Sequence, residues 1–150
     1  MASTLTNLNY HVIFSTKNRY PLIQSSVQRE LFDYIGGILR NRKAILLEIG
    51  GIEDHVHLVI KLKADLSISE IVRVVKANSS KWMNERFGPA KMFAWQVGYG
   101  AFTVSSSQLN SVCRYVECQK EHHAKRSFKE EYLAFLKGNN LAFDAEHVWG

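Results

Sequence analysis

The sequence is poor in cysteine and proline, and it has no long apolar run. Its two cysteines, Cys113 and Cys118, would point away from each other on a helix, so a disulfide between them is not expected. No Cys-x-x-Cys pair is present to support a thiolate zinc site. No stretch approaches the roughly 20 apolar residues of a membrane span, and the N-terminus lacks the basic and apolar regions of a secretory signal. We therefore expect a protein of the reducing cytoplasm without a membrane partner.

Internal repeats, low-complexity tracts and Pro/Gly-rich linkers are also missing, which favours a single domain over residues 1–150. A hydrophobic content of 46% lets such a chain bury a core without disulfides. Nineteen Lys and Arg residues against 14 Asp and Glu residues give a net charge of +5. This excess favours a polyanionic partner, most often nucleic acid, although a mildly basic protein without such a partner has the same balance.

Residue periodicity predicts an α+β fold with the order β-α-β-β-α-β, followed by further helices. The expected strands cover residues 8–16, 44–49, 54–62 and 92–97, the last with an extension over 101–104. The expected helices begin near residues 25, 67, 108 and 127, and the last three end near 86, 123 and 138. This order is the ferredoxin-like split βαβ pattern, which RNA-recognition (RRM-like) domains also use. We expect an antiparallel sheet with helices on its apolar face and an open second face.

Short motifs predict the boundaries of these elements. Capping boxes indicate three helix starts, at Ser25-x-x-Gln28, Ser67-x-x-Glu70 and Ser127-x-x-Glu130. Gly50-Gly51 predicts a turn or bulge between the second and third strands, which should pair as a hairpin. Gly88-Pro89 predicts the end of the second helix.

One predicted strand carries two histidines on the same face. Along residues 54–62 the aliphatic side chains of Val56, Leu58 and Ile60 alternate with His55 and His57. The aliphatic set should face the core, which leaves the histidines side by side on the other face. Their Cα atoms would lie about 6.6–6.8 Å apart, close enough for two imidazoles to bind one cation. The plainer alternative is two histidines on a solvated sheet surface.

A second pattern lies on the helix expected over residues 108–123. Tyr115, Gln119 and His122 fall at i, i+4 and i+7 and form a polar stripe beside the apolar one. A tyrosine hydroxyl can attack a phosphodiester, but only about 0.1% of phenol is ionised at pH 7, so a cation on the scissile phosphate is needed. Gln119 lies one turn beyond Tyr115 and can supply an amide oxygen as a third ligand beside His55 and His57. Surface packing is the alternative role for a lone tyrosine.

Three other residues could be mistaken for the nucleophile or for metal ligands. Tyr99 is a second candidate nucleophile, but it lies between two glycines and has no ligand one turn away, so Tyr115 is preferred. We expect His122 and His123 to end the helix and to interact with its dipole when charged, rather than to bind metal.

Together these residues resemble the HUH-superfamily single-tyrosine transposases of small bacterial and archaeal insertion sequences, including the group associated with repetitive extragenic palindromes (REP). The matching pieces span most of the chain and are Tyr10–Phe14, His55–Val59, Trp95–Tyr99 and Tyr115–Gln119. His-x-His alone is a weak signal. The Tyr-x-x-x-Gln motif downstream of it, in this order of strands and helices, makes the match specific.

The resemblance implies a metal-dependent endonuclease and strand transferase that performs DNA transposition. Tyr115, on the C-terminal helices, would form a 5′-phosphotyrosine intermediate on single-stranded DNA with hairpins at the element ends. His55, His57 and Gln119 would hold Mg²⁺ or Mn²⁺, of which Mn²⁺ suits imidazole better. A homodimer is implied, in which the tyrosine helix can serve the histidine pair of the other copy. The same resemblance suggests five DNA contacts: Lys17, Arg19, Lys61, Arg73 and Lys76.

Two other functions remain open. A non-catalytic ferredoxin-like module would bind single-stranded nucleic acid on its open sheet, although the open face of the His strand offers no aromatic side chain. A metal-dependent nuclease with a water nucleophile would not need Tyr115. Replacement of Tyr115 by phenylalanine separates these functions from the tyrosine mechanism.

Overall fold

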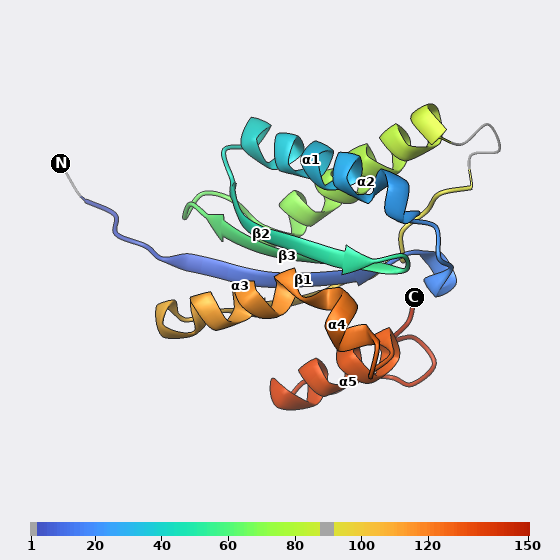
Figure 1. Ribbon diagram of the computed structural model, residues 1–150. Coiled ribbons are helices and arrows are strands. Elements are labelled where there is room, and N and C mark those ends of the chain that lie inside the picture. Colours follow the sequence, from blue (N-terminus) through green and yellow to red (C-terminus); the bar gives the residue numbers. More distant parts are fainter. Residues whose placement is uncertain (1–2, 88–91) are drawn as a thin grey trace.

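The computed structural model describes residues 3–87 and 92–150 (Figure 1). Its strands are β1 (Leu8–Ser15), β2 (Ile45–Ile52), β3 (His55–Leu62) and β4 (Gly100–Thr103). Its α-helices are α1 (Ser25–Asn41), α2 (Ile68–Phe87), α3 (Leu109–Glu117), α4 (Gln119–His123) and α5 (Phe128–Gly138). Short 3-10 turns cover Lys17–Arg19 and Ser106–Gln108. Within the described residues, no helix is both long enough and apolar enough to cross a membrane.

The strands form one antiparallel sheet in the order β2-β3-β1-β4. β3 and β1 are therefore the central strands, and His57 on β3 lies opposite Ile13 on β1. The connections through α1 and α2 complete the split βαβ arrangement. The predicted α+β, ferredoxin-like fold is confirmed.

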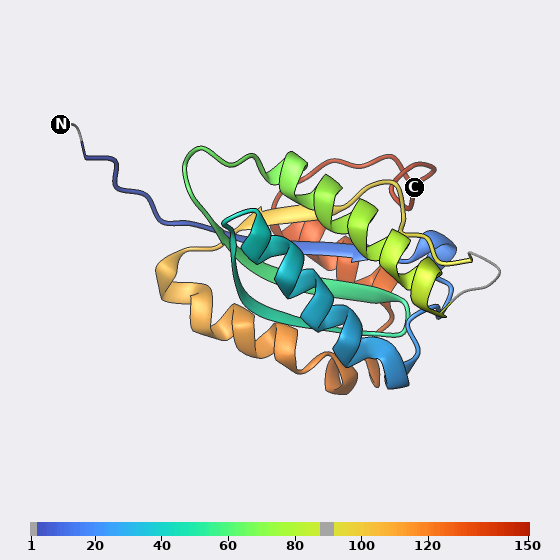
Figure 2. The ribbon, with the colours of Figure 1, turned by 90° about the horizontal axis from the view of Figure 1, so that it is seen from above.

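α1 and α2 cover one face of the sheet (Figure 1; Figure 2). β3 contributes Val56, Leu58 and Ile60 to this face, and all three side chains are fully buried. They belong to one hydrophobic cluster with Leu39 of α1 and Val75 of α2. The alternation along β3 therefore supplies an unbroken apolar surface on this side, as its sequence predicts.

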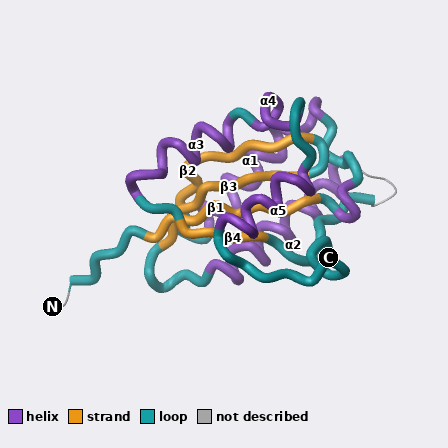
Figure 3. The backbone as a smooth tube through the Cα atoms, turned by 90° about the horizontal axis from the view of Figure 1, so that it is seen from below, coloured by secondary structure: helices purple, strands orange, loops and turns teal. Residues whose placement is uncertain are grey.

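The opposite face of the sheet is covered as well, so the expectation of an open face is wrong. α3, α4 and α5 lie across it (Figure 1; Figure 3), and His55 and His57 are both 0% exposed. Ile13 of β1 forms a second hydrophobic cluster there with Phe128 and Tyr132 of α5. The apolar stripe of α5 needs a partner surface, and this half of the sheet provides one.

β2 is longer than expected, because Gly50 and Gly51 lie inside the strand rather than in a turn. They pair with His57 and Val56 of β3, and the irregularity of the ladder falls between Leu46 and Glu48 instead. Gly50 has a packing role, since a Cβ atom there would collide with the carbonyl oxygen of Val116. The absence of a side chain thus lets α3 lie against the sheet.

The helix expected over residues 108–123 is interrupted. Cys118, with φ −99° and ψ 34°, separates α3 from α4, and α3 follows a 3-10 turn over Ser106–Gln108. Both cysteines are free, as expected. The break turns the chain so that α4 follows the sheet beneath β2, as seen in Figure 3.

Most other expected boundaries need only small changes. The capping boxes at Ser67 and Ser127 are confirmed, because each hydroxyl accepts the backbone N–H three residues later. The one at Ser25 is wrong: α1 begins at that residue, and Gln28 donates instead to the carbonyl of Gly51.

The strand expected over residues 92–97 is also wrong. Trp95 makes an isolated bridge with Thr16, and regular pairing starts only in β4. The helix stop predicted at Gly88-Pro89 lies outside the described residues.

Candidate active site

His55 and His57 lie on the central strand β3 with their Nε2 atoms pointing to a common centre. At the other ring nitrogen, His55 Nδ1 lies 2.7 Å from Asp54 Oδ1. His57 Nδ1 lies 2.8 Å from His11 Nε2, on β1. Metal-binding histidines are oriented in this way by partners of their second nitrogen. The predicted pair is therefore brought together, with two orienting groups, Asp54 and His11, that the sequence analysis did not identify.

Gln119 joins the pair from α4. Its Oε1 atom lies 3.2 Å from His55 Nε2, and its Nε2 atom donates to the backbone carbonyl of Tyr115 at 3.1 Å. The side chain is 1% exposed. The break at Cys118 thus sends Gln119 inward, and the three predicted ligands share one site.

Tyr115, the predicted nucleophile, reaches this site from the last turn of α3. Its ring centre is 5.9 Å from that of His57, and its hydroxyl donates a hydrogen bond to Glu131. The ring of His122 stacks on its other side, at 4.3 Å between centres. Tyr99, the alternative nucleophile, packs instead with the cluster beneath α1 and α2. The geometry favours Tyr115 because it alone of the two lies beside the histidines.

Two further residues complete the centre, and the sequence analysis missed both. Glu131 Oε1, from α5, lies 2.9 Å from His57 Nε2 and 3.1 Å from His123 Nε2. His123 Nε2 also lies 3.0 Å from Gln119 Oε1. His123 does end a helix, as expected, but the expectation that it is not a candidate metal ligand is wrong, because its side chain points into the site and is 5% exposed.

One sequence signal was available for Glu131. It lies among Phe128, Tyr132 and Phe135 at spacings that place it on the apolar stripe of its helix. A carboxylate on a buried stripe requires a partner, because an unpaired buried charge is costly. For His123 no comparable signal exists, since its direction depends on the break at Cys118.

The pKa values of the buried histidines are shifted in opposite directions, depending on burial and on the carboxylates that each one contacts. Burial lowers the pKa of His55, but hydrogen bonds to Asp54 and Glu131 outweigh it and raise the pKa to about 9. Burial lowers the pKa of His57 to about 4 and that of His11 to about 3. At neutral pH the centre therefore contains a charged imidazole beside neutral ones.

The pKa values of Glu131 and of Tyr115, the predicted nucleophile, are shifted too. Burial alone would raise the pKa of Glu131, but hydrogen bonds from His123, His55 and His57 hold it far below its ordinary value. Burial and the hydrogen bond to Glu131 both raise the pKa of Tyr115, against a smaller opposing effect of Arg126. The phenol is neutral in this arrangement and needs assistance to react.

The donor set suits a divalent cation. His55, His57, His123 and Glu131 each offer a ligand atom, and these atoms lie within 4.8 Å of one another. Gln119 adds a neutral oxygen. Imidazole nitrogen combined with carboxylate and amide oxygen favours Mn²⁺ and also accepts Mg²⁺. These residues therefore fit the metal that the resemblance implies.

The five predicted DNA contacts are spread over the molecule rather than gathered at Tyr115. Arg73 pairs with Glu70 on α2, and Lys17 and Arg19 occupy the turn after β1. Lys61 lies near the end of β3. By contrast, a 500 Å³ cleft beside Tyr115 is lined by two cations that were not predicted, Lys125 and Arg126.

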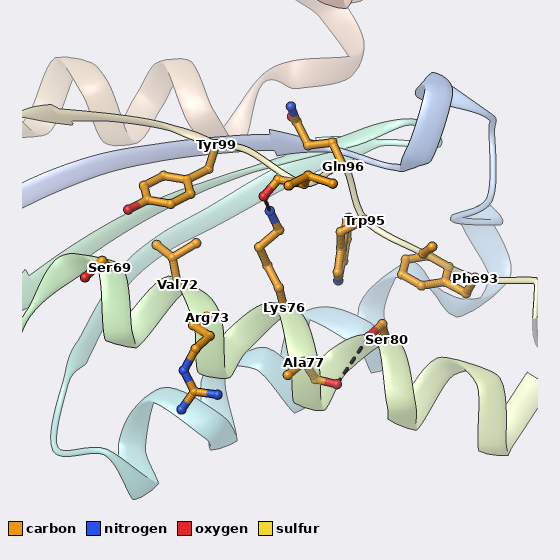
Figure 4. Close-up of a pocket in the computed structure, with 12 residues that line it drawn as sticks. Ser69, Val72, Arg73, Lys76, Ala77, Ser80, Phe93, Trp95, Gln96 and Tyr99 are labelled. Carbon is orange, nitrogen blue, oxygen red and sulfur yellow. Dashed lines mark hydrogen bonds between the residues drawn. The ribbon is translucent and has the colours of Figure 1, made fainter. Parts of the chain in front are cut away.

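Lys76 lies in a different setting, on the apolar side of the sheet. Its Nζ atom donates to the carbonyls of Val97 and Gly98 in a 430 Å³ cavity between α2 and residues 93–99 (Figure 4). Tyr99 lines the same cavity. Burial lowers the pKa of Lys76 to about 8. This cation is thus engaged by the protein itself.

The sequence of this chain is similar to those of known transposases. It is 28% identical over 130 residues to the transposase for insertion sequence element IS200 from Salmonella typhimurium, covering 81% of this chain and 82% of that one. It is 24% identical over 119 residues to the ISDra2 transposase TnpA of Deinococcus radiodurans, covering 76% and 85%.

Solved structures share the fold. The crystal structure of a protein from Deinococcus radiodurans R1 superposes with a TM-score of 0.66 at 25% identity, covering 79% of this chain and 95% of that one. A REP-associated tyrosine transposase bound to a REP hairpin superposes with a TM-score of 0.57 at 15% identity, covering 77% and 70%. The family model described as "Transposase IS200 like" matches residues 4–119, which include His55, His57 and Tyr115. The chain belongs to this family of IS200-like transposases, enzymes of DNA transposition.

Proposed function

We propose that this chain is a metal-dependent endonuclease and strand transferase that acts on single-stranded DNA through Tyr115. The observation that carries the proposal concerns the Tyr115 hydroxyl, which donates a hydrogen bond to Glu131. The same carboxylate contacts the imidazoles of His55 and His57. Membership of a transposase family supplies the reaction class, DNA cleavage and rejoining. The domain over residues 1–150 is proposed to act as one unit.

In the proposed step, the Tyr115 oxygen attacks the scissile phosphorus. The new O–P bond forms as the bond from phosphorus to the 3′ oxygen breaks, and the phenolic proton is balanced by the proton gained on the departing 3′-OH. Mg²⁺ or Mn²⁺, held by His55, His57 and Gln119, would neutralise charge on the phosphate. The resulting 5′-phosphotyrosine conserves the bond energy, so attack by a 3′-OH rejoins DNA by the reverse step.

We propose hairpins at the element ends as the substrate, in keeping with the hairpin bound to the REP-associated neighbour. We propose that Lys125 and Arg126 hold the strand near the scissile phosphate, because they are the cations of the cleft beside Tyr115, which Glu121 and Glu130 also line. Lys17, Arg19, Lys61, Arg73 and Lys76 remain proposed contacts for more distant parts of the DNA. Because cations that neutralise phosphates release counterions, binding should weaken steeply as salt rises, and a flat dependence would contradict this surface.

A homodimer is also proposed, on the family resemblance. In this structure Tyr115 contacts Glu131 and Gln119 of its own chain. Sedimentation at micromolar concentration tests the dimer, and a mass near 17.2 kDa would argue against it.

The test of the chemistry uses single-stranded DNA carrying the hairpins that flank the host gene, with Mn²⁺ and a denaturing gel. Wild type should give a shifted covalent protein–DNA band, and Tyr115→Phe should abolish that band while hairpin binding stays within several-fold. Tyr99→Phe is the matched control and should retain the band. His57→Ala should lose Mn²⁺-dependent activity.

The same gel separates the competing functions. Cleavage by Tyr115→Phe would mean that water attacks, as in a metal-dependent nuclease. Binding without cleavage by wild type, across a panel of hairpins, would leave the non-catalytic module. The covered histidine face disfavours that module, because no open sheet surface remains at His55 and His57 for bases to stack on.

A further inference from the structure

Glu131 lies at the centre of the site, yet the predicted ligand set gives it no role. It comes from α5, 74 residues after His57 and 16 residues after Tyr115. Its side chain is 1% exposed. A carboxylate buried this deeply persists only where its partners offset the loss of hydration.

The two oxygens of this carboxylate contact different groups. Oε1 lies 2.9 Å from His57 Nε2 and 3.5 Å from His55 Nε2. Oε2 accepts the hydroxyl of Tyr115. One side chain thus links the proposed metal-binding imidazoles with the proposed nucleophile.

The donor-atom distances around Glu131 and His55 match those expected within a coordination sphere. Ligands bound to one cation at about 2.1 Å, at right angles to one another, lie about 3 Å apart. The contacts of Glu131 Oε1 with the two β3 histidines span 2.9–3.5 Å, and Gln119 Oε1 lies 3.2 Å from His55 Nε2. All four groups present the atom that a cation would bind.

We propose that Glu131 is a fourth protein ligand of the divalent cation and the residue that positions Tyr115. Oε1 takes the place in the ligand set beside His55, His57 and Gln119, while Oε2 holds the nucleophilic hydroxyl next to it. The inference rests on the proposed function and deepens it. With these four ligands an octahedral ion would keep two positions, which a substrate oxygen, water or His123 can fill, since His123 Nε2 lies 3.1 Å from Glu131 Oε1.

The position of Glu131 depends on the docking of α5. Phe128 and Tyr132 anchor the helix in the second hydrophobic cluster, and Ser127 caps its first turn. A cation bound through Glu131 is therefore tied to this helix. Binding should slow the opening of α5, which hydrogen exchange of its amides reports.

The test measures Mn²⁺ binding directly, by calorimetry on the full chain without DNA. Wild type should bind, and Glu131→Gln, which keeps the shape but lowers the charge, should weaken binding at least about tenfold. Glu130→Gln, an exposed carboxylate one residue away, is the matched control and should bind like wild type. Mn²⁺ should slow hydrogen exchange in α5 of wild type and of Glu130→Gln, but not of Glu131→Gln.

Circular dichroism in EDTA checks that the variant is folded. If Glu131→Gln does not fold, Glu131→Asp takes its place, because it keeps the charge and withdraws the oxygens from the site. Weakened Mn²⁺ binding by the folded variant supports the assignment. Equal or tighter binding overturns it, and tighter binding would mean that Glu131 occupies the cation position as a competitor.

The outcomes also separate this inference from the proposed function. If wild type binds Mn²⁺ and forms the covalent DNA product while Glu131→Gln binds Mn²⁺ equally well, only the role of Glu131 fails. If wild type binds no Mn²⁺ at millimolar concentration, the metal dependence fails and Glu131 as a ligand fails with it.

Discussion

The two faces of β3 are equally buried but differ in kind. On one face Val56, Leu58 and Ile60 meet α1 and α2 and stabilise the fold by removing apolar area from water. On the other face His55 lies at hydrogen-bond distance from Gln119 of α4 and His57 from Glu131 of α5, and both histidines are 0% exposed. A single strand therefore supports the stability of the sheet on one side and the proposed chemistry on the other, and changes to each side should have separable effects.

The largest effect on stability is expected from the apolar face. Leu58→Ala should lower the free energy of unfolding by about 2–5 kcal/mol, because it removes buried methyl groups and leaves a cavity. Urea denaturation measures the change, with the half-exposed Ile45→Ala as the control that should lose much less. Folded Leu58→Ala should still bind Mn²⁺, and loss of binding would show that the two faces are not separable.

A substitution at Gly50, where α3 lies closest to β2, tests whether the proposed chemistry depends on packing against the polar face. Gly50→Ala should push the Val116 carbonyl, and α3 with it, away from the sheet. We expect about 1–3 kcal/mol of destabilisation and about a hundredfold slower formation of the covalent product, because Tyr115 moves. Gly37→Ala, in α1, has room for its Cβ atom and should retain both properties. A normal rate in Gly50→Ala would show that Tyr115 tolerates displacement of its helix.

The pH dependence of stability should also distinguish the faces. In EDTA, the raised pKa of His55 means that the folded chain holds a proton between pH 6.5 and about 9 that the unfolded chain releases. This stabilisation is fully present below pH 6.5 and is lost as pH rises through 9, on the order of 1–3 kcal/mol. Asp54→Asn, which removes one partner of His55, should flatten the loss measured by urea denaturation. An unchanged slope would contradict the role of Asp54 in this shift.

The smallest expected effect comes from Lys76, on the apolar side. Its pKa is lowered to about 8 by burial, so from pH 8 to 10.5 the unfolded chain binds a proton that the folded chain has lost. Stability contributed by this group should therefore rise over that window, opposite in sign to the effect of His55. Lys76→Met should remove the rise, as the difference between unfolding free energies at pH 8 and pH 10 reports. A rise that persists in Lys76→Met would assign it to another group.

The fold could be predicted from the sequence wherever local periodicity decides it. Alternation along β3 placed Leu58 in the core and His57 on the other face, and the order of elements gave the sheet. The open second face was a wrong prediction because periodicity shows that α5 has an apolar stripe but does not show where it docks. The strand expected at residues 92–97 failed for a similar reason, since only Trp95 finds a partner there.

The site could be predicted only in its local motifs. His55 and His57 share a strand face, and Tyr115 and Gln119 lie one turn apart, so spacing was enough to propose them together. Glu131 enters from a separate helix, and its place beside His57 depends on tertiary packing that spacing does not encode.

The division of the site along the chain has a consequence for its synthesis. The main hydrophobic cluster takes its buried residues from positions 12 to 95, whereas Tyr115, Gln119 and Glu131 all come later. On a ribosome, the residues that form the main core therefore emerge before the proposed nucleophile and the last proposed ligand. A nascent chain of this transposase would have to extend past α5 before the proposed site could be complete.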